Sequence, residues 1–499
     1  MKKVFVFLFI LIFLMTGCGA PAAQIIAHES AITWWCPNRY NHVGNMADSA
    51  VYGRLMEETG VDVAFVHPPQ GEHRERLLAL LGEEKLPDII THDFVGDYPG
   101  GAEKALADGV IVPLNDIIET HCPNLSAYLD AHPEIKKKIS TKDGRVFCFP
   151  SVQAEREIRT YIGPYIRTDY LDAVGMDQPE TVAEYKAVLT ALKQQLGVSP
   201  LSFYGGKIMD TDFLIGAYGL SWGFFVDEGQ VRLGPLEENF LVFIEEFKAW
   251  YDAGLISPGV FTDSQKTYTA KAMRGDTGIY VDYVTSIERY AGGIDGASFA
   301  PLKYPVRSKG DKAFSGHIAP VFVPYASCYI SPDNKDIEAT ARLLDYAYSA
   351  QGGLLYNFGI EGESYTMESG QPVYLPSVLN APEGFGDAVK KYLASGAYVR
   401  DPRQFAQMLT TDEQRQAVKL WSDTQAAQHA MPGVALSASQ SEAVAAFNEG
   451  YKDVVITWLK DYFLSGSETT TVQELQETLM NLGAAQAIQT YQEALNEQS

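Results

Sequence analysis

The sequence places aromatic and polar side chains where they could bind a ligand, but it carries no motif of a known catalytic site. The patterns HExxH, GxSxG and GxxxxGK[ST] and the glycine fingerprint of dinucleotide-binding folds are all missing. With 63 Asp and Glu residues, carboxylate pairs suited to glycoside hydrolysis occur by chance and indicate nothing alone. The nine His residues are scattered without metal-ligand spacing. We therefore expect a binding protein and not an enzyme, with no metal site and no cofactor.

Four aromatic residues are candidates for stacking on a ligand. Trp34 and Trp35 end the apolar run AITWW, Trp222 lies between glycines in GLSWGFFVDEG, and Tyr283 lies in GIYVDYV. Aromatic rings of this kind suit the apolar C–H faces of sugars. Packing in a core is the alternative for each of them. We favour ligand stacking for Trp222 and for at least one of the first two tryptophans.

Five further residues are candidates for ligand contact, four of them able to hydrogen-bond a ligand's hydroxyl groups through a carboxylate or amide. Asp93 ends a short apolar run, and capping of a loop is its alternative role. Gln153 and Glu155 follow the run VFCFPSV, where they either bind ligand or satisfy backbone groups. Glu363 and Tyr365 lie in FGIEGESYTMESGQPVY, where bracing of a loop is equally compatible with the pattern.

Alternating strands and helices position these residues in the first part of the chain. Strands are predicted at 31–35, 61–66 and 88–91, and helices at 48–59 and 72–84. This order predicts parallel strands with helices on both faces. Ligands of such sheets bind beyond the carboxyl ends of the strands, here 34–39, 67–70 and 91–97. Further helices are predicted at 182–196, 236–253 and 337–349 and through most of the last hundred residues.

Composition narrows the possible partners. The 499 residues have a formal net charge of -24 and 12% aromatic residues. Such a chain repels phosphate backbones and anionic membrane surfaces, so we expect no nucleic-acid partner. After Cys18, four cysteines remain, namely Cys36, Cys122, Cys148 and Cys328. They form disulfides in one of three pairings, or they are buried free thiols.

The N-terminus has the pattern of an export signal. Lys2 and Lys3 precede an apolar run at 4–14, which is too short to span a bilayer. The following Met15-Thr16-Gly17-Cys18 resembles a bacterial lipobox, which predicts a signal peptide at 1–17, lipidation of Cys18 and a tether at 18–30. An ordinary signal peptide cleaved nearby is the alternative.

Six segments in order resemble the family-1 extracellular solute-binding lipoproteins of ABC importers, the LipO-like group. They are LPDIITHDF (86–94), GVIVPLNDIIETHCPNL (109–125), DGRVFCFPSV (143–152), RTDYLDAVGMDQPETVAEYKAVLTALK (167–193), FGIEGESYTMESGQPVY (358–374) and WLKDYFLSG (458–466). Tyr170 stands where the family usually has Trp. The resemblance covers nearly the whole chain from residue 31.

The resemblance implies an α/β protein with a two-lobed periplasmic-binding-protein-like fold of type II. Each lobe is then a sheet flanked by helices, and hinge strands join the lobes near 150–161 and 323–331. We expect an N-terminal lobe of 31–150 plus 266–328 and a C-terminal lobe of 151–265 plus 329–499. Gln153 and Glu155 then lie at the start of the hinge.

The implied function is capture of a carbohydrate, an oligosaccharide, by closure of the lobes and delivery to the permease subunits of an ABC importer. We expect a monomer outside the cytoplasm, held at the bacterial cell membrane by the lipid on Cys18. Capture of peptides or other polar solutes, or a secreted glycan-active enzyme or adhesin without a role in transport, are the alternatives. Many family members have a calcium loop after the helix that here ends near Leu196, but this chain passes from LKQQLG into VSPLSFYGG without clustered carboxylates. We therefore expect no calcium there.

Overall fold

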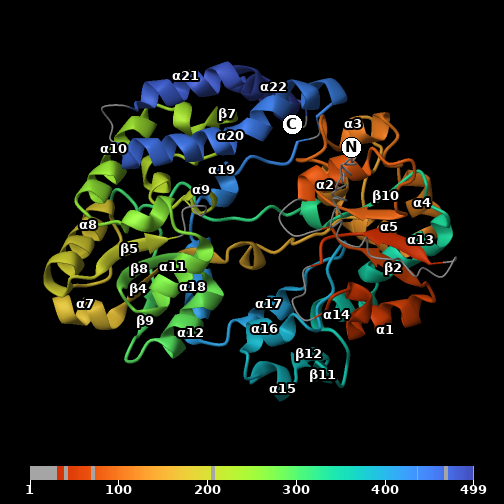
Figure 1. The fold of residues 1–499 in the computed structure, drawn as a ribbon, viewed down its shortest axis with the longest axis horizontal. Helices are drawn as coiled ribbons and strands as arrows, with labels where there is room; N and C mark the ends of the chain where they lie inside the picture. The colour runs from red at the N-terminus through yellow and green to blue at the C-terminus, as the bar shows by residue number, and fades with distance from the viewer. Residues whose placement is uncertain are drawn as a thin grey trace, which may run out of the picture.

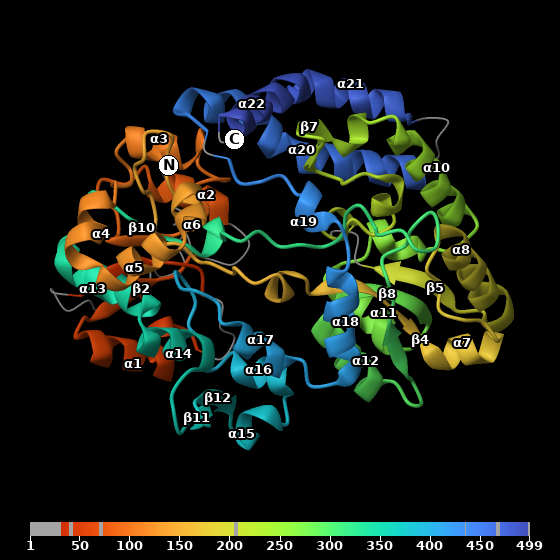
Figure 2. The ribbon, with the colours of Figure 1, turned by 180° about the vertical axis from the view of Figure 1, so that it is seen from behind.

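The computed structural model describes residues 31–38, 43–68, 73–203, 208–434, 436–465 and 470–497. The chain forms two lobes that are joined by several connecting segments, as Figures 1 and 2 show from opposite sides. The predicted signal peptide, Cys18 and the tether lie outside the described residues. Within the described ranges, no helix combines the length and the apolar character that crossing a bilayer requires.

The first lobe is built on a four-stranded sheet with the order β10-β3-β1-β2. β1 (Ile32–Trp35) pairs in parallel with β2 (Val63–Val66) and β3 (Ile89–Thr91), and β10 (Cys328–Ile330) is antiparallel to β3. The predicted parallel arrangement is confirmed. The helices of this lobe are α1 (Ala50–Thr59), α2 (His73–Leu80), α3 (Gly101–Ala107), α4 (Asn115–His121), α5 (Pro123–Ala131), α6 (Pro133–Lys138), α13 (Ile337–Asp345) and α14 (Ala350–Phe358).

Local signals explain where the helices of the first lobe begin and end. The Ser49 side chain accepts a hydrogen bond from the backbone N–H of Tyr52 and so caps α1. Gly60 ends the same helix with a φ of 64°, a left-handed conformation that favours glycine. These caps place α1 within two residues of its predicted start and at its predicted end.

The second lobe is built on a sheet with the order β5-β8-β4-β9. β5 (Ser199–Phe203) is parallel to β8 (Thr277–Tyr283), and β4 (Ile162–Arg167) is antiparallel to both β8 and β9 (Phe299–Pro301). A small hairpin of β6 (Phe224–Asp227) and β7 (Gln230–Leu233) lies apart from this sheet. The helices of this lobe are α7 (Thr168–Val174), α8 (Val182–Ala191), α9 (Ile208–Thr211), α10 (Asn239–Asp252), α11 (Gln265–Met273), α12 (Val284–Gly293), α18 (Asp412–Ser422), α19 (Ala426–His429), α20 (Ala438–Leu464), α21 (Val472–Leu482) and α22 (Ala484–Asn496).

The two hydrophobic cores correct the predicted lobe boundaries. β8 lies between β5 and β4, so the segment from 266 to 301 belongs to the second lobe and not to the first. β10, α13 and α14 pack in the core of the first lobe and not of the second. The chain thus returns to the first lobe later than predicted, because the backbone hydrogen bonds of β8 are made to strands of the second lobe.

Three segments run side by side through the hinge. Val152 forms an antiparallel bridge with Phe322 and a parallel bridge with Val399. The first two segments lie close to the predicted crossings, and the third was not predicted. It follows a small unit of β11 (Tyr365–Glu368), β12 (Gln371–Tyr374), α15 (Pro376–Leu379) and α16 (Phe385–Val389), and it leads into α17 (Pro402–Met408).

The C-terminal helices cover the second lobe and reach the first. An apolar stripe of α20 packs in the second core, where Val444, Phe447 and Trp458 are buried. α20 also contacts α3 of the first lobe, where Ser441 lies beside Gly101 (Figure 1). One long helix therefore touches both lobes.

Candidate functional site

The carboxyl ends of β1 and β3 lie beside the hinge, and a pocket opens there. Its cavity volume is only about 10 Å³, room for about one water molecule, and its lining residues are Trp34, Cys36, Pro37, Thr91, Ala326, Ser395 and Gly396. Because β1 and β3 are parallel, their carboxyl ends share one edge of the sheet. The strand ends and the hinge together position this part of the candidate site.

Trp34 and Trp35 are core residues, which corrects our preference for an open stacking face. Trp34 is 1% exposed, donates a hydrogen bond from Nε1 to Thr91 Oγ1 at 2.8 Å and stacks on Phe65. Trp35 is buried against His92. A sheet of parallel strands is covered on both faces, so successive side chains are both buried. Trp34 reaches the pocket only as part of its wall.

A cluster of aromatic and charged residues lies where the hinge meets the second sheet. The rings of Tyr161 and Tyr283 are parallel, with centroids 6.1 Å apart, and His317 packs edge-on against Tyr161 at 4.5 Å. Burial and the neighbouring Tyr325 and Tyr283 raise the pKa of Tyr161 to about 12. Arg400 also lies close enough to influence this phenol. Tyr283 is the sequence candidate that the structure supports best.

Tyr325 connects the cluster to the pocket. It is 51% exposed, one of the most exposed large apolar side chains in the described ranges, and the next residue, Ala326, lines the pocket. Its electrostatic influence on Tyr161 shows that the two phenols are near one another. A solvent-accessible aromatic beside a polar, aromatic cluster is an arrangement that can hold a hydroxylated ring.

Gln153 lies in the hinge and ties its segments together. Its backbone N–H donates to Val321 O at 2.9 Å, and its side-chain Nε2 donates to Pro320 O at 2.9 Å. Arg400 Nη1 donates to Gln153 Oε1 at 3.4 Å. Gln153 therefore forms hydrogen bonds with the hinge backbone, which is the alternative role that the sequence left open for it. Glu155 is exposed on the same segment.

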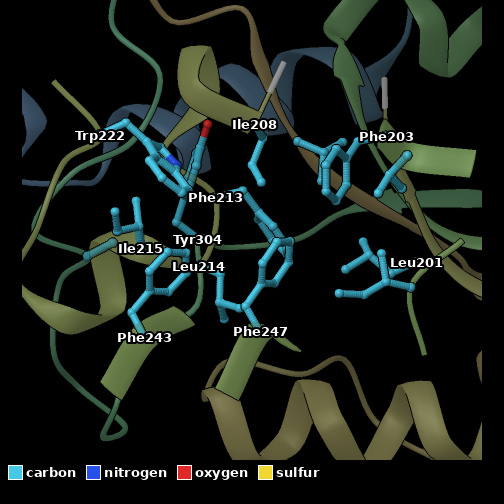
Figure 3. Close-up of a cluster of buried hydrophobic side chains, with 14 of the residues drawn as sticks. Leu201, Phe203, Ile208, Phe213, Leu214, Ile215, Trp222, Phe243, Phe247 and Tyr304 are labelled. Carbon is cyan, nitrogen blue, oxygen red and sulfur yellow. The ribbon is translucent and has the colours of Figure 1, made fainter. Parts of the chain in front are cut away.

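Trp222 is buried in the second lobe, which overturns our preference for stacking on a ligand. Its indole is 1% exposed and meets Phe240 and Phe243 edge-on at 5.7 and 5.5 Å. Figure 3 shows it among Phe213, Ile215, Phe243 and other apolar side chains. The flanking glycines suggested a loop, but the loop folds inward because Asp212 Oδ1 accepts a hydrogen bond from the backbone N–H of Trp222 at 3.0 Å.

The remaining candidates lie in structural roles or apart from the cluster. Asp93 Oδ1 accepts from the Gly96 N–H at 2.7 Å, so it caps its loop, and burial raises its pKa. Tyr365 is buried against Phe358 in the small hairpin unit. Glu363 is exposed in the turn before that hairpin. Asp93, Glu363 and Tyr365 are not among the residues of the Tyr161–Tyr283 cluster, so they are not proposed as ligand contacts.

Sequence reasoning missed several residues of this site. Tyr325, His317 and Arg400 lie on hinge segments that contain no motif, and they meet only because the segments run side by side. The run VFVPYASCYI contained one usable signal, a tyrosine after a proline at a predicted lobe crossing. Arg400 lies on the crossing that was not predicted.

The structure also describes the groups that could hold a metal or form disulfides. In the described part of the chain, no set of three or more His, Cys, Asp or Glu side chains is grouped to hold a metal ion. Cys36, Cys122, Cys148 and Cys328 are buried free thiols, which is one of the two alternatives left open by the sequence. Whether the protein binds calcium stays a prediction.

Comparison with known proteins gives relatives in sequence and in fold. No family model matches the chain. The chain is 25% identical over 342 residues to the fructooligosaccharide ABC transporter substrate-binding protein FusA of Streptococcus pneumoniae, covering 63% of this chain and 60% of that protein's length. It is 22% identical over 444 residues to the lipoprotein LipO of Bacillus subtilis, covering 81% of this chain and 85% of LipO.

Solved structures share the fold over nearly the whole chain. FusA of S. pneumoniae in complex with kestose has a TM-score of 0.78 at 20% identity, covering 94% of this chain and 99% of that one. The alginate-binding protein AlgQ2 has a TM-score of 0.77 at 21% identity with the same coverage. The two-lobed, periplasmic-binding-protein-like fold is confirmed. The chain is thus similar in sequence to the ABC transporter substrate-binding protein FusA and to the lipoprotein LipO, in agreement with the resemblance found in its sequence motifs.

Proposed function

We propose that the protein is an extracytoplasmic receptor that captures an oligosaccharide between its lobes and delivers it to an ABC importer. The observation that carries the proposal is the aromatic cluster of Tyr161, Tyr283 and Tyr325 at the hinge of this scaffold. A ligand that contacts both lobes binds the closed state more tightly, so binding energy selects closure. A permease then distinguishes the closed from the open receptor.

The chemistry of the cluster fits a sugar better than an apolar or polyanionic solute. Tyrosine rings offer apolar faces together with hydroxyl groups, and His317 and Arg400 add polar groups at the same place. The chain's net charge of -24 disfavours polyanions. Relatives on this fold include proteins described as binding kestose, fructo-nystose and human milk oligosaccharides (HMO). These names support a neutral oligosaccharide as the first ligand to try.

The location follows from the N-terminal sequence. The proposed lipid on Cys18 holds the receptor at the outer face of the bacterial cell membrane, near the permease. LipO, which matches over most of this chain, is itself a lipoprotein. Replacing Cys18 by Ala should release the protein from the membrane fraction or block its processing. A Cys18→Ala protein that is both processed and membrane-bound contradicts the lipid anchor.

The binding test is a thermal-shift screen followed by calorimetry. The panel is kestose, fructo-nystose, a human milk oligosaccharide, Man1GlcNAc and an alginate oligosaccharide. A ligand that binds only the folded state raises Tm, by an amount that grows with the logarithm of its concentration over Kd. The ligand should be recovered chemically unchanged, because the receptor performs no reaction on it.

A matched pair of variants ties binding to the site. Tyr325→Ala removes an exposed ring at the hinge and should weaken binding of the best ligand without lowering Tm of the free protein. Leu241→Ala removes a side chain of similar exposure from α10, away from the hinge, and should change neither quantity. Equal affinity of wild type and Tyr325→Ala contradicts the site, and failure of every oligosaccharide contradicts the function.

A further inference from the structure

A second, more polar recess is lined in part by Tyr283. It is formed by α11, the end of β8 and the start of α12, it is open to solvent, and it has a cavity volume of about 110 Å³. Polar side chains dominate its lining, which consists of Gln265, Tyr268, Thr269, Asp282, Tyr283, Thr285, Ser286 and Arg289. Tyr283 therefore belongs both to this recess and to the aromatic cluster at the hinge.

A fixed carboxylate lines the inner part of the recess. Asp282 is 8% exposed, and its two oxygens accept from the backbone N–H of Tyr283 at 2.8 Å and from Tyr290 Oη at 3.0 Å. The hydroxyl of Tyr268 is buried beside Asp282 and Tyr290 and so forms part of the wall behind this carboxylate.

Donors surround the opening. Arg289 is exposed, lies over the ring of Tyr290 at 5.0 Å and donates from Nη2 to Ser286 Oγ at 3.0 Å. The same Nη2 also lies 3.4 Å from Tyr290 Oη, so the exposed guanidinium is held at this side of the opening. Gln265 and Thr285 are exposed on the two helices that flank the opening. The recess thus combines a carboxylate acceptor, a guanidinium donor and several hydroxyl and amide groups.

We infer that this recess is a second subsite, which takes a neutral, hydroxylated sugar ring at one end of the ligand. The inference rests on the proposed function and makes it more specific. A pair of neighbouring hydroxyl groups can donate to the Asp282 carboxylate and accept from Arg289, while Tyr283 forms a wall toward the next ring. A carboxylate on the sugar meets the buried charge of Asp282 and the acidity of the whole chain, so uronic sugars such as those of alginate are disfavoured.

The test compares neutral and acidic ligands on recess variants by calorimetry. Wild type should bind kestose or fructo-nystose more tightly than an alginate oligosaccharide of equal length. Asp282→Asn and Arg289→Gln should each weaken neutral-ligand binding by roughly tenfold to a hundredfold, as expected when a hydrogen bond to a charged group is lost. Thr285→Val keeps the shape of an exposed side chain and should weaken binding by a few-fold, with Tm of the free protein unchanged.

The controls separate the recess from folding and from the proposed function itself. Arg274→Gln removes an exposed arginine just beyond the end of α11, which pairs with Asp276 at 3.2 Å, and this variant should bind as wild type does. Wild-type affinity in both Arg289→Gln and Thr285→Val, or tighter binding of alginate than of the neutral ligands, overturns the subsite. If Tyr325→Ala still weakens neutral-ligand binding in that case, the proposed function stands without it. If wild type binds no oligosaccharide, the proposed function is contradicted, and the subsite with it.

Discussion

Tyr161 and Tyr283 lie with parallel rings at the point where the hinge enters the second sheet, with an interplanar angle of 5° and centroids 6.1 Å apart. Tyr161 directly precedes β4, and Tyr283 ends β8, the antiparallel neighbour of β4. The backbone N–H of Val284 donates to Tyr161 O at 2.8 Å, which holds the two positions together. The strand register therefore creates a tyrosine pair at the edge of the sheet that borders the hinge.

This pair leads to a prediction for Tyr283. Tyr283→Ala removes the ring that the hinge cluster shares with the polar recess, and should weaken sugar binding by roughly 1–3 kcal/mol, about five- to two-hundredfold in Kd. Tyr283→Phe keeps the ring face and should retain most of the affinity. Calorimetry with the best ligand of the screen measures both. Similar losses in the two variants would show that the phenol oxygen, and not the ring, makes the contact.

A second prediction concerns Trp222. Because the indole is packed in the second core, Trp222→Ala should lower the free energy of unfolding by about 3–5 kcal/mol, as large-to-small core substitutions do. Trp222→Phe fills more of the space and should cost less. Urea unfolding measures both effects. A Trp222→Ala protein with wild-type stability and reduced ligand affinity would place the indole at the ligand and contradict the packing.

The parts of the fold that depend on local pattern could be predicted from the sequence. The alternating strands and helices of the first lobe follow from periodicity and caps, as at Ser49 and Gly60. The lobe boundaries could not be predicted, because the placement of β8 depends on pairing with β4 and β5, far from it in the chain. Likewise Trp222 has the local context of an exposed loop, and only the carboxylate of Asp212 reveals that the loop turns inward.

Asp212 itself predicts a dependence of stability on pH. Its carboxylate is buried, accepts from Ser221 Oγ at 2.8 Å and from the N–H of Trp222, and burial raises its pKa to about 6 from an ordinary 3.8. A carboxyl group whose pKa is raised in the folded state contributes most to the free energy of unfolding below pH 3.8, where it is protonated in both states. This contribution is lost as the pH rises through 6. The loss reaches roughly 3 kcal/mol at most.

The variant that checks this is Asp212→Asn, which cannot ionise and tolerates the backbone φ of 50° at this position. Its amide oxygen can still accept from the N–H of Trp222. Relative to wild type, the variant should gain stability between pH 5 and pH 7.5, as measured by urea unfolding at each pH. A constant difference between the two proteins across this range would show that Asp212 does not titrate there.

Calcium removal gives a fourth prediction. The helical stretch after α8 ends at Gly197, with a φ of 67°, and β5 begins at Ser199, so one residue separates the helix cap from the strand. That distance leaves no room for a loop with the six or more oxygen ligands that calcium takes. EDTA should therefore leave Tm unchanged. A fall of several degrees that calcium restores would reveal a site elsewhere in the chain.

The last prediction concerns the thiols of the folded protein. Cys36, Cys122, Cys148 and Cys328 are buried without a disulfide among them. Burial raises the pKa of Cys122 to about 12 and that of Cys328 to about 11, so little reactive thiolate forms near neutral pH.

The geometry of the hinge also argues against a disulfide between Cys148 and Cys328, which lie on neighbouring segments. Phe149 and Cys328 are directly paired, so the adjacent Cys148 projects to the opposite face from Cys328. In a protein that lacks Cys18, a thiol reagent should label none of these cysteines rapidly in the native state and all four in denaturant. The intact mass should be the same before and after reduction. A mass that rises by two hydrogens on reduction would show a disulfide, and would require the backbone around the paired residues to differ from the fold described.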